Sequence, residues 1–126
     1  MRKIPLHILR IGLAVTFLWI GVLIIMQPVQ WGSYMQVWAS RLLPLPIEPM
    51  MLSVGVFDIV IGALLILGVI IPLAAALAAL HLASVLVVSG ITDITVRDVG
   101  LLAAALALSI ESLPEPLARK ILRIHE

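Results

Sequence analysis

The sequence predicts an all-α membrane protein, a four-helix transmembrane bundle with short interfacial helices in the first outer loop and at the C-terminus. Of its 126 residues, 63% are hydrophobic and 12% are charged, and the mean hydropathy is +1.23. A soluble globular protein cannot bury so much apolar surface. Four segments also approach or reach the length of about 20 apolar residues that crosses a bilayer. We therefore expect a single membrane domain over residues 1–126.

The first spanning helix is predicted at about residues 5–26. Pro5 stands at its start, where a missing backbone N–H costs nothing, and Pro28 follows its end. The apolar run is longer than that of a typical signal peptide, and no small-x-small cleavage site follows it. We expect this helix to stay in the protein.

The long connection that follows predicts an interfacial helix at about 31–42. Large, mostly aromatic side chains recur in it at helical spacing, namely Trp31, Tyr34 or Met35, Trp38 and Leu42. Trp and Tyr favour the headgroup level, which supports a helix lying on the membrane surface, and a lid over a ligand site is the alternative. Pro44, Pro46 and Pro49 predict an extended return to the second spanning helix.

The second and third spanning helices are predicted at about 50–71 and 73–91, and Pro72 separates them into a tight hairpin. The fourth is predicted at about 96–113, because Pro114 and the proline two residues later cannot continue a helix. Asp93 or Thr95 can cap its start, and Asp98 suits the positive end of its dipole.

The tail at about 116–125 has apolar side chains on one face and basic side chains on another, which predicts a second interfacial helix. The distribution of basic residues predicts a multi-pass protein of the plasma (inner) membrane with both termini cytoplasmic. In that orientation Arg41 and Arg97 lie outside, whereas five basic residues lie inside: Arg2, Lys3, Arg119, Lys120 and Arg123.

Each predicted helix carries one stripe of small or polar residues, which are the residues that let helices pack closely in lipid. The stripes are Arg10, Ala14, Phe17 and Gly21 in the first helix; Gly55, Asp58 and Gly62 in the second; Ala74, Ala78 and His81 in the third; and Arg97, Gly100, Ala104, Ala107 and Glu111 in the fourth. We expect the four stripes to converge in a compact bundle.

The candidate intramembrane polar site comprises Asp58, His81, Arg97 and Asp98. A charge in the membrane costs at least about 2.5 to 3.5 kcal/mol, so such residues must be paired, neutral or solvated. At about 1.5 Å per residue, the depths of Asp58 and His81 differ by only about 6 Å, which allows contact between them. Arg97 could extend toward Asp58 from the outer interface.

Arg10 and Glu111 fall at similar depth near the inner side and form a second candidate pair. Two interpretations of both groups are open. The residues either fix helix register by satisfying one another, or they line a functional pocket.

No catalytic signature is found: the sequence contains no nucleophile–base arrangement, no Gly-rich phosphate loop and no paired catalytic carboxylates. It has no cysteine, and no second His follows His81 at i+4, so we expect no metal or haem site. The formal charge of +1, with basic residues gathered at the ends, gives no sign of a nucleic-acid partner.

Three groups of residues together resemble the DoxX-like membrane proteins. They are Arg10 followed by Phe17 and Gly21; Gly55-x-x-Asp58-x-x-x-Gly62 with Leu64-Leu65 and Gly68; and Arg97-Asp98-x-Gly100-Leu101-Leu102. The resemblance covers the first, second and fourth helices. Within it, the residues that match polar positions of the family are Arg10, Asp58, Arg97 and Asp98.

This resemblance implies a small four-helix membrane protein, some of whose relatives are subunits of thiosulfate:quinone oxidoreductase or partners of redox enzymes. It does not imply catalysis by this chain. Asp58 stands where many relatives carry Glu, and residues 22–26 lack the basic residue that often follows the first-helix glycine. The second departure removes support for an anion or quinone headgroup site at the outer end of that helix.

The leading functional hypothesis is a non-catalytic anchoring or accessory subunit of a membrane redox complex, quinone- or sulfur-linked, present as a homo-oligomer or a hetero-complex. One alternative is a bundle that binds a lipophile such as a quinone, with Asp58, His81 and Arg97 at its polar end. Another is a small transporter or proton pathway that uses Asp58 and His81 in an oligomer.

Overall fold

The computed structural model describes residues 3–90, 92 and 95–114, and throughout these ranges the chain forms helices joined by turns, with no strand. The helices in order are α1 (Lys3–Met26), α2 (Pro28–Gly32), α3 (Val37–Arg41), α4 (Ile47–Leu67), α5 (Ile71–Ser89) and α6 (Val96–Glu111). The predicted all-α class is confirmed.

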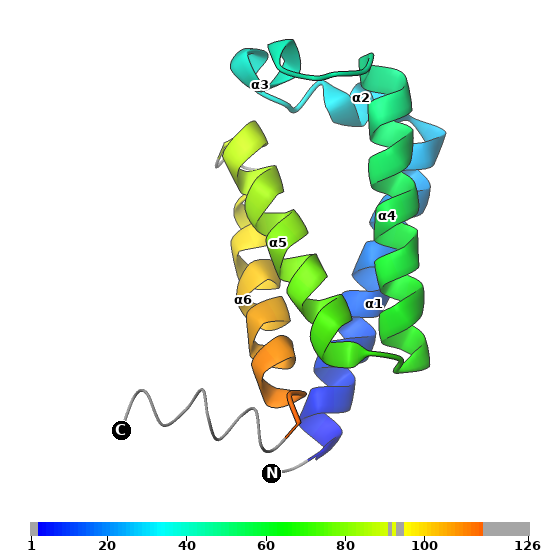
Figure 1. The fold of residues 1–126 in the computed structure, drawn as a ribbon, viewed down its shortest axis with the longest axis vertical. Helices are drawn as coiled ribbons and strands as arrows, with labels where there is room; N and C mark the ends of the chain where they lie inside the picture. Colours follow the sequence, from blue (N-terminus) through cyan, green and yellow to red (C-terminus); the bar gives the residue numbers. More distant parts are fainter. Residues whose placement is uncertain (1–2, 91, 93–94, 115–126) are drawn as a thin grey trace.

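The four longer helices form two antiparallel pairs (Figure 1). In the first pair α1 packs along α4, and in the second α5 packs along α6. The two pairs approach each other at the end where α1 begins and diverge toward the other end, where α2 and α3 lie across the top (Figure 1). This splayed arrangement positions the site described below.

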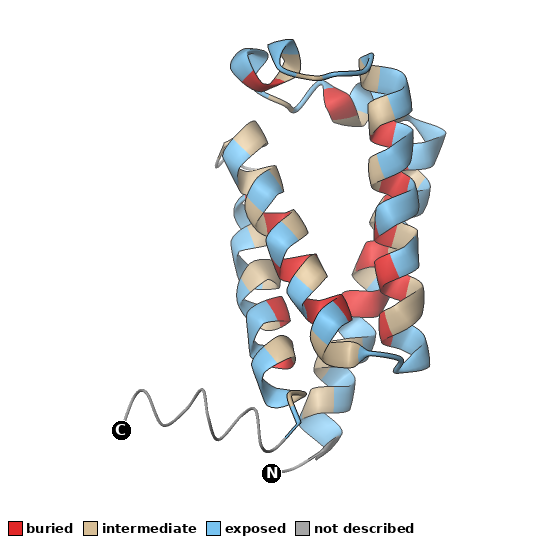
Figure 2. Ribbon diagram, viewed as in Figure 1, coloured by how far each residue is buried: buried red, intermediate tan, exposed pale blue. Residues whose placement is uncertain are grey.

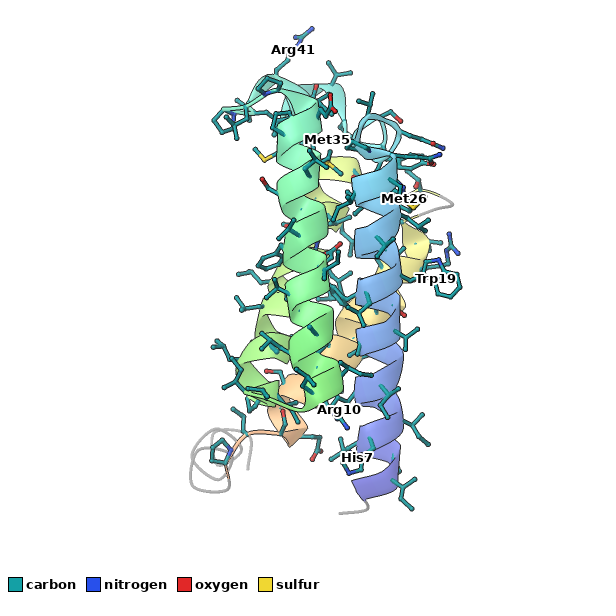
Figure 3. The ribbon with its side chains drawn as sticks, turned by 90° about the vertical axis from the view of Figure 1, so that its right-hand side faces the viewer. His7, Arg10, Trp19, Met26, Met35 and Arg41 are labelled. Atoms are coloured by element: carbon teal, nitrogen blue, oxygen red, sulfur yellow. The ribbon has the colours of Figure 1, made fainter. Side chains whose placement is uncertain are left out.

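Three of the helices are long and apolar enough to cross a membrane: α1 from Ile4, α4 and α5. The protein is therefore a multi-pass membrane protein. Their outward faces carry large apolar side chains, among them Trp19 at 67% and Leu80 at 69% exposure, and Figure 3 shows Trp19 pointing away from the bundle. In a bilayer such side chains are solvated by lipid, so their exposure costs little.

The core lies on the facing sides of the four longer helices (Figure 2), and it combines alanines with larger apolar side chains such as Ile61, Leu65 and Leu108. On α5 the buried residues are Ala74, Ala75, Ala78, Ala79 and Leu82. The small-residue stripes predicted for α1, α4 and α5 do face inward, with Ala14, Gly62 and Ala78 all buried. Small side chains let helix backbones approach closely, which replaces the hydrophobic effect as a source of packing energy in lipid.

The backbones of α1 and α4 touch at glycines. A Cβ atom added to Gly21 would lie 2.8 Å from the carbonyl oxygen of Gly55, and one added to Gly55 would lie 3.0 Å from the carbonyl oxygen of Gly21. Further along, a Cβ on Gly62 would lie 3.0 Å from the carbonyl oxygen of Ala14. Only glycine permits this approach at these positions.

The hairpin between α4 and α5 differs from the prediction because Gly68, not Pro72, ends α4. Gly68 adopts φ 72°, and its N–H and that of Val69 donate to the carbonyls of Leu65 and Leu64. This is a typical glycine C-cap, so α4 ends four residues before the predicted residue 71. Pro72 instead lies in the first turn of α5, where a proline fits.

The single helix predicted at 31–42 is wrong, since the first loop contains two five-residue helices, α2 and α3. Gly32 at the end of α2 packs directly against α4: an added Cβ would lie 2.5 Å from Ile47 Cγ2. Four residues later the N–H of Gln36 donates to the carbonyl of Val88 on α5, at 2.8 Å. The loop is thus held by both helix pairs, and α4 starts at Ile47 with Pro49 inside its first turn.

The stripe predicted for the fourth helix is also wrong. Four of its five members, Arg97, Gly100, Ala107 and Glu111, are exposed, whereas the buried residues of α6 are Ala105 and Leu108. Small side chains occur on several faces of α6, so their spacing did not define one packing face. The hydroxyl of Ser109 donates to the carbonyl of Pro72 at 3.1 Å, which fixes the observed rotation of the helix against α5. The predicted tail helix at 116–125 lies outside the described residues.

We expect Gly21→Ala to lower the free energy of unfolding by about 1–3 kcal/mol, because the added methyl group meets the backbone of Gly55. The matched control is Gly12→Ala on the same helix, where an added Cβ has nothing within 4 Å. The control should stabilise the protein by about 0.5–1 kcal/mol through helix propensity. Equal effects of the two variants on unfolding in lipid nanodiscs would contradict the close packing of α1 on α4.

Candidate functional site

The buried face of α4 carries Asp58 between the two glycines that pack on α1. Gly55 lies three residues before Asp58 and Gly62 four residues after it, so the three share a face by helical periodicity. Asp58 is 3% exposed and is, with Thr95, one of two buried polar residues in the described chain. The packing of α1 on α4 therefore places a carboxyl group inside the bundle.

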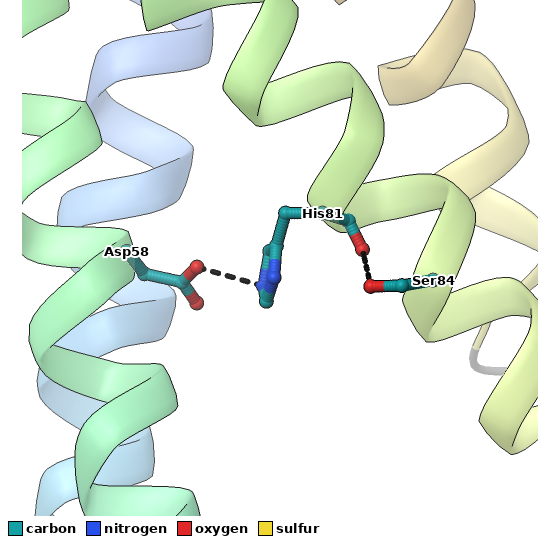
Figure 4. Close-up of polar contacts among 3 residues, drawn as sticks. All are labelled: Asp58, His81 and Ser84. Carbon is teal, nitrogen blue, oxygen red and sulfur yellow. Dashed lines mark hydrogen bonds and ion pairs between the residues drawn. The ribbon is translucent and has the colours of Figure 1, made fainter.

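From the second helix pair, α5 presents His81 to this carboxyl group (Figure 4). Its Nε2 lies 2.9 Å from Asp58 Oδ1, so the contact that the helix depths allowed is present. The contact becomes a salt bridge when the imidazole is protonated. The distance is that of an ion pair, and within the described chain Oδ1 has no hydrogen bond. Asp58 therefore has hydrogen-bonding capacity left.

Two phenylalanines and a serine lie around His81. The ring centroids of Phe57 and Phe17 lie 5.2 and 6.3 Å from that of the imidazole, both tilted against it. The hydroxyl of Ser84 donates to the backbone carbonyl of His81 at 2.7 Å, one turn along α5. The imidazole thus lies between aromatic rings from α1 and α4, which limits the directions in which it can turn.

Asp58 and His81 line a cavity of about 640 Å³ between the two helix pairs. Its walls are mainly apolar, with Ile20 and Ile24 from α1 and Val85 from α5. A volume in this range, with apolar walls and a few polar groups, is typical of sites for small molecules. The cavity follows from the splay of the two pairs, because small residues close the bundle only where the pairs meet.

The first loop covers the cavity. Trp31 and Tyr34, whose rings pack edge to face at 5.8 Å, line it together with Met35. The N–H of Gln36 donates a hydrogen bond of 2.8 Å to the carbonyl oxygen of Val88, and this bond attaches the loop to the end of α5. The loop therefore lies over the cavity, and both interpretations of it, a surface helix and a lid over a ligand site, stay predictions.

The turn into α6 contributes Thr95 to the cavity lining. Its hydroxyl donates to the carbonyl of Gly90 at 2.5 Å and accepts the Thr92 N–H at 2.8 Å. Thr95 holds the N-cap position of α6, but its side chain makes no cap hydrogen bond, because it is engaged by the preceding turn. The predicted cap by Thr95 is therefore wrong, and the alternative, Asp93, lies outside the described residues.

The other two predicted site residues, Arg97 and Asp98, also line the cavity. Arg97 is exposed and Asp98 is half-buried. In the part of the chain that the structure describes, Asp58 is paired with His81 and not with Arg97. The structure thus brings the four predicted site residues to one cavity, with direct contact only between Asp58 and His81.

The second candidate pair does not form. Arg10 extends to the C-terminal end of α4 (Figure 3), where its Nη1 donates to the carbonyls of Leu65 and Ile66, the latter at 3.1 Å. The last carbonyls of a helix lack intrahelical partners and carry the negative end of its dipole, so a guanidinium is a favourable partner. Glu111 is exposed at the end of α6. Gly68 marks the end of α4 in the sequence and lies beside Arg10 in the structure.

These features define a multi-pass helical membrane protein with a polar pair beside an apolar cavity. The DoxX family model matches residues 6–90, which is more than half of the chain. The protein belongs to the DoxX family. The match includes Asp58 and His81, extends over α5 and stops before the Arg97-Asp98 motif. Neither the curated proteins nor the solved structures gave a match.

We expect Arg10→Met to lower the free energy of unfolding by about 1.5–3 kcal/mol, because two carbonyls at the end of α4 lose a charged donor. Met keeps a similar length and helix propensity. Glu111→Gln should change stability by less than about 0.5 kcal/mol. Unfolding of the single and double variants in nanodiscs measures this. A strong effect of Glu111→Gln that vanishes in the Arg10→Met background would restore the predicted pair.

Proposed function

We propose that this protein is a non-catalytic binding protein of the membrane, which holds a small lipophilic molecule of quinone type in the cavity between its two helix pairs. The single observation that carries the proposal is a buried carboxyl group, that of Asp58, at the wall of a largely apolar cavity of about 640 Å³. An ionisable residue inside a membrane protein costs stability and usually marks a functional site.

The cavity suits a ligand with an apolar body and one polar end. The body would lie along the apolar walls formed by Ile20, Ile24 and Val85, and the polar end would meet Asp58 and His81. Trp31 and Tyr34 above the cavity offer ring faces and edges to a planar headgroup. A quinone would supply redox chemistry when bound, and the residues of this chain would bind and orient it.

The surroundings of His81 suit a binding role. Besides Asp58, its neighbours are two phenylalanine rings and a serine whose hydroxyl is bonded to the backbone. Asp58 and His81 can accept hydrogen bonds from a ligand or donate them to it, and this binding role requires no further side chain.

A second candidate function is the anchoring or accessory subunit of a membrane redox complex. It is supported by the outward face of α6, where Ala103 and Ala107 are exposed and would let a helix of another subunit approach closely. The chain has no cysteine, so a single Ala107→Cys variant can report a partner by crosslinking in native membranes. Crosslinking no stronger than from Gly12→Cys on α1 would count against this role. The transporter or proton-pathway alternative stays a prediction.

We also propose that α6 is a fourth membrane crossing and that both termini face the cytoplasm at the plasma membrane. In support, α1 begins and α6 ends at the same end of the bundle (Figure 1). Arg10 lies toward that end and Arg41 at the opposite one (Figure 3). Reporter fusions at the two termini should both report the cytoplasm, and fusions reporting opposite sides would exclude a fourth crossing.

The binding proposal predicts that a decyl-substituted benzoquinone stabilises the purified protein, by about 2.7 kcal/mol at a free concentration of 100 times Kd. Val85→Phe fills the cavity and should abolish this stabilisation. Val87→Phe, two residues away on α5 and 64% exposed, is the matched control and should retain it. Thermal unfolding in nanodiscs measures both. Equal stabilisation of the two variants, or none of the unmodified protein, would refute binding in this cavity.

A further inference from the structure

We infer that the polar end of the ligand is a hydrogen-bond donor, such as a phenolic or hydroquinone hydroxyl, and that Asp58 is the group that accepts it. This inference rests on the proposed function and specifies its ligand class. The juxtaposition behind it is a carboxyl group that is 3% exposed, lines a cavity and has one oxygen, Oδ2, that neither His81 nor any other described residue hydrogen-bonds.

Asp58 retains acceptor capacity beside the cavity. A carboxylate has two oxygens that only accept hydrogen bonds, and a buried one requires donors. His81 Nε2 lies 2.9 Å from Oδ1, which is buried, so the imidazole occupies that oxygen. Within the described chain Oδ2 receives no hydrogen bond, and it is the oxygen that a ligand in the cavity can reach.

Other polar groups around the cavity do not supply Asp58 with a donor. The hydroxyl of Thr95 is engaged by the backbone of Gly90 and Thr92, and that of Ser84 donates to the His81 carbonyl. Arg97 is exposed, and across the described ranges it forms no ion pair with Asp58. The donor that Asp58 lacks from the protein can therefore come from a molecule in the cavity.

An acceptor oxygen without a donor makes the cavity selective for ligands that carry a hydroxyl group. A ligand hydroxyl donating to a buried carboxylate forms a charge-assisted bond, which a ligand without the hydroxyl proton cannot replace. The expected preference is about 10- to 100-fold in Kd, the range set by hydrogen bonds to charged groups. Within a quinone couple the reduced form has hydroxyl donors and the oxidised form has only carbonyl acceptors. The site should thus favour the reduced form.

The test uses two redox-inert probes that differ only in the donor, 4-nonylphenol and its methyl ether. Kd is measured for both from ligand-induced stabilisation of the full chain in nanodiscs. We expect the phenol to bind about 10- to 100-fold more tightly than the ether. In Asp58→Asn and Asp58→Leu the ratio should fall to within a few-fold. Asp98→Asn, the matched change of the other cavity carboxyl group, should retain the preference.

The outcomes separate this inference from the proposed function. Equal binding of phenol and ether to the unmodified protein would overturn the inference and leave binding in the cavity intact. Tighter binding of the ether would also overturn it. If the preference is lost in Asp98→Asn but kept in the Asp58 variants, Asp98 accepts the hydrogen bond and the assignment to Asp58 is wrong. If neither probe nor the quinone binds, the proposed function fails as well. Should the Asp58 variants not fold, the two probes on the unmodified protein decide.

Discussion

The rest of the structure depends on placing the Asp58 carboxyl group inside a helical membrane protein. Lipid offers it no hydrogen bonds, and on insertion scales such a group costs at least about 2.5 to 3.5 kcal/mol. The fold brings His81 to it from the other helix pair, with Nε2 at 2.9 Å from Oδ1. This contact links α4 to α5 beside the cavity through Oδ1, and it leaves the second carboxyl oxygen available to a ligand.

Close packing of helices through small residues explains both where the bundle is closed and where the cavity lies. Glycines bring α1 and α4 into backbone contact, and alanines on α5 close the core where the pairs meet. Beyond His81 the lining of α5 changes to larger side chains such as Val85 and Val88, and the pairs diverge beneath the first loop. Space for a ligand thus coincides with the end of the small-residue packing, next to the buried polar pair.

The sequence predicted the features that helical periodicity controls. The inward faces of α1, α4 and α5 and the contact between Asp58 and His81 all follow from spacing and depth. The rotation of α6 about its axis could not be predicted, because alanines occur on several of its faces. The face that packs on α5 is set by the hydrogen bond from the Ser109 hydroxyl to the carbonyl of Pro72, which is distant in sequence. The contact of Arg10 with α4 was not predicted, because Arg10 was paired with the oppositely charged Glu111. In the structure its guanidinium binds carbonyls at the C-terminal end of α4, which lack intrahelical partners. That Trp31 and Tyr34 line the cavity was not predicted, since sequence does not show that Gln36 ties the loop to α5.

The most direct test of the account is a solid-state NMR measurement of where a bound ligand's hydroxyl lies. The protein would carry ¹³C in its aspartate carboxyl groups, and an alkylphenol would carry ¹³C at the hydroxyl-bearing carbon, both in lipid bilayers. The Asp58 resonance is identified by its absence in Asp58→Asn. The account predicts a close dipolar contact between that resonance and the phenol carbon. A contact to another aspartate, or to none while the phenol is bound, would contradict the assignment of Asp58 as the group that holds the ligand.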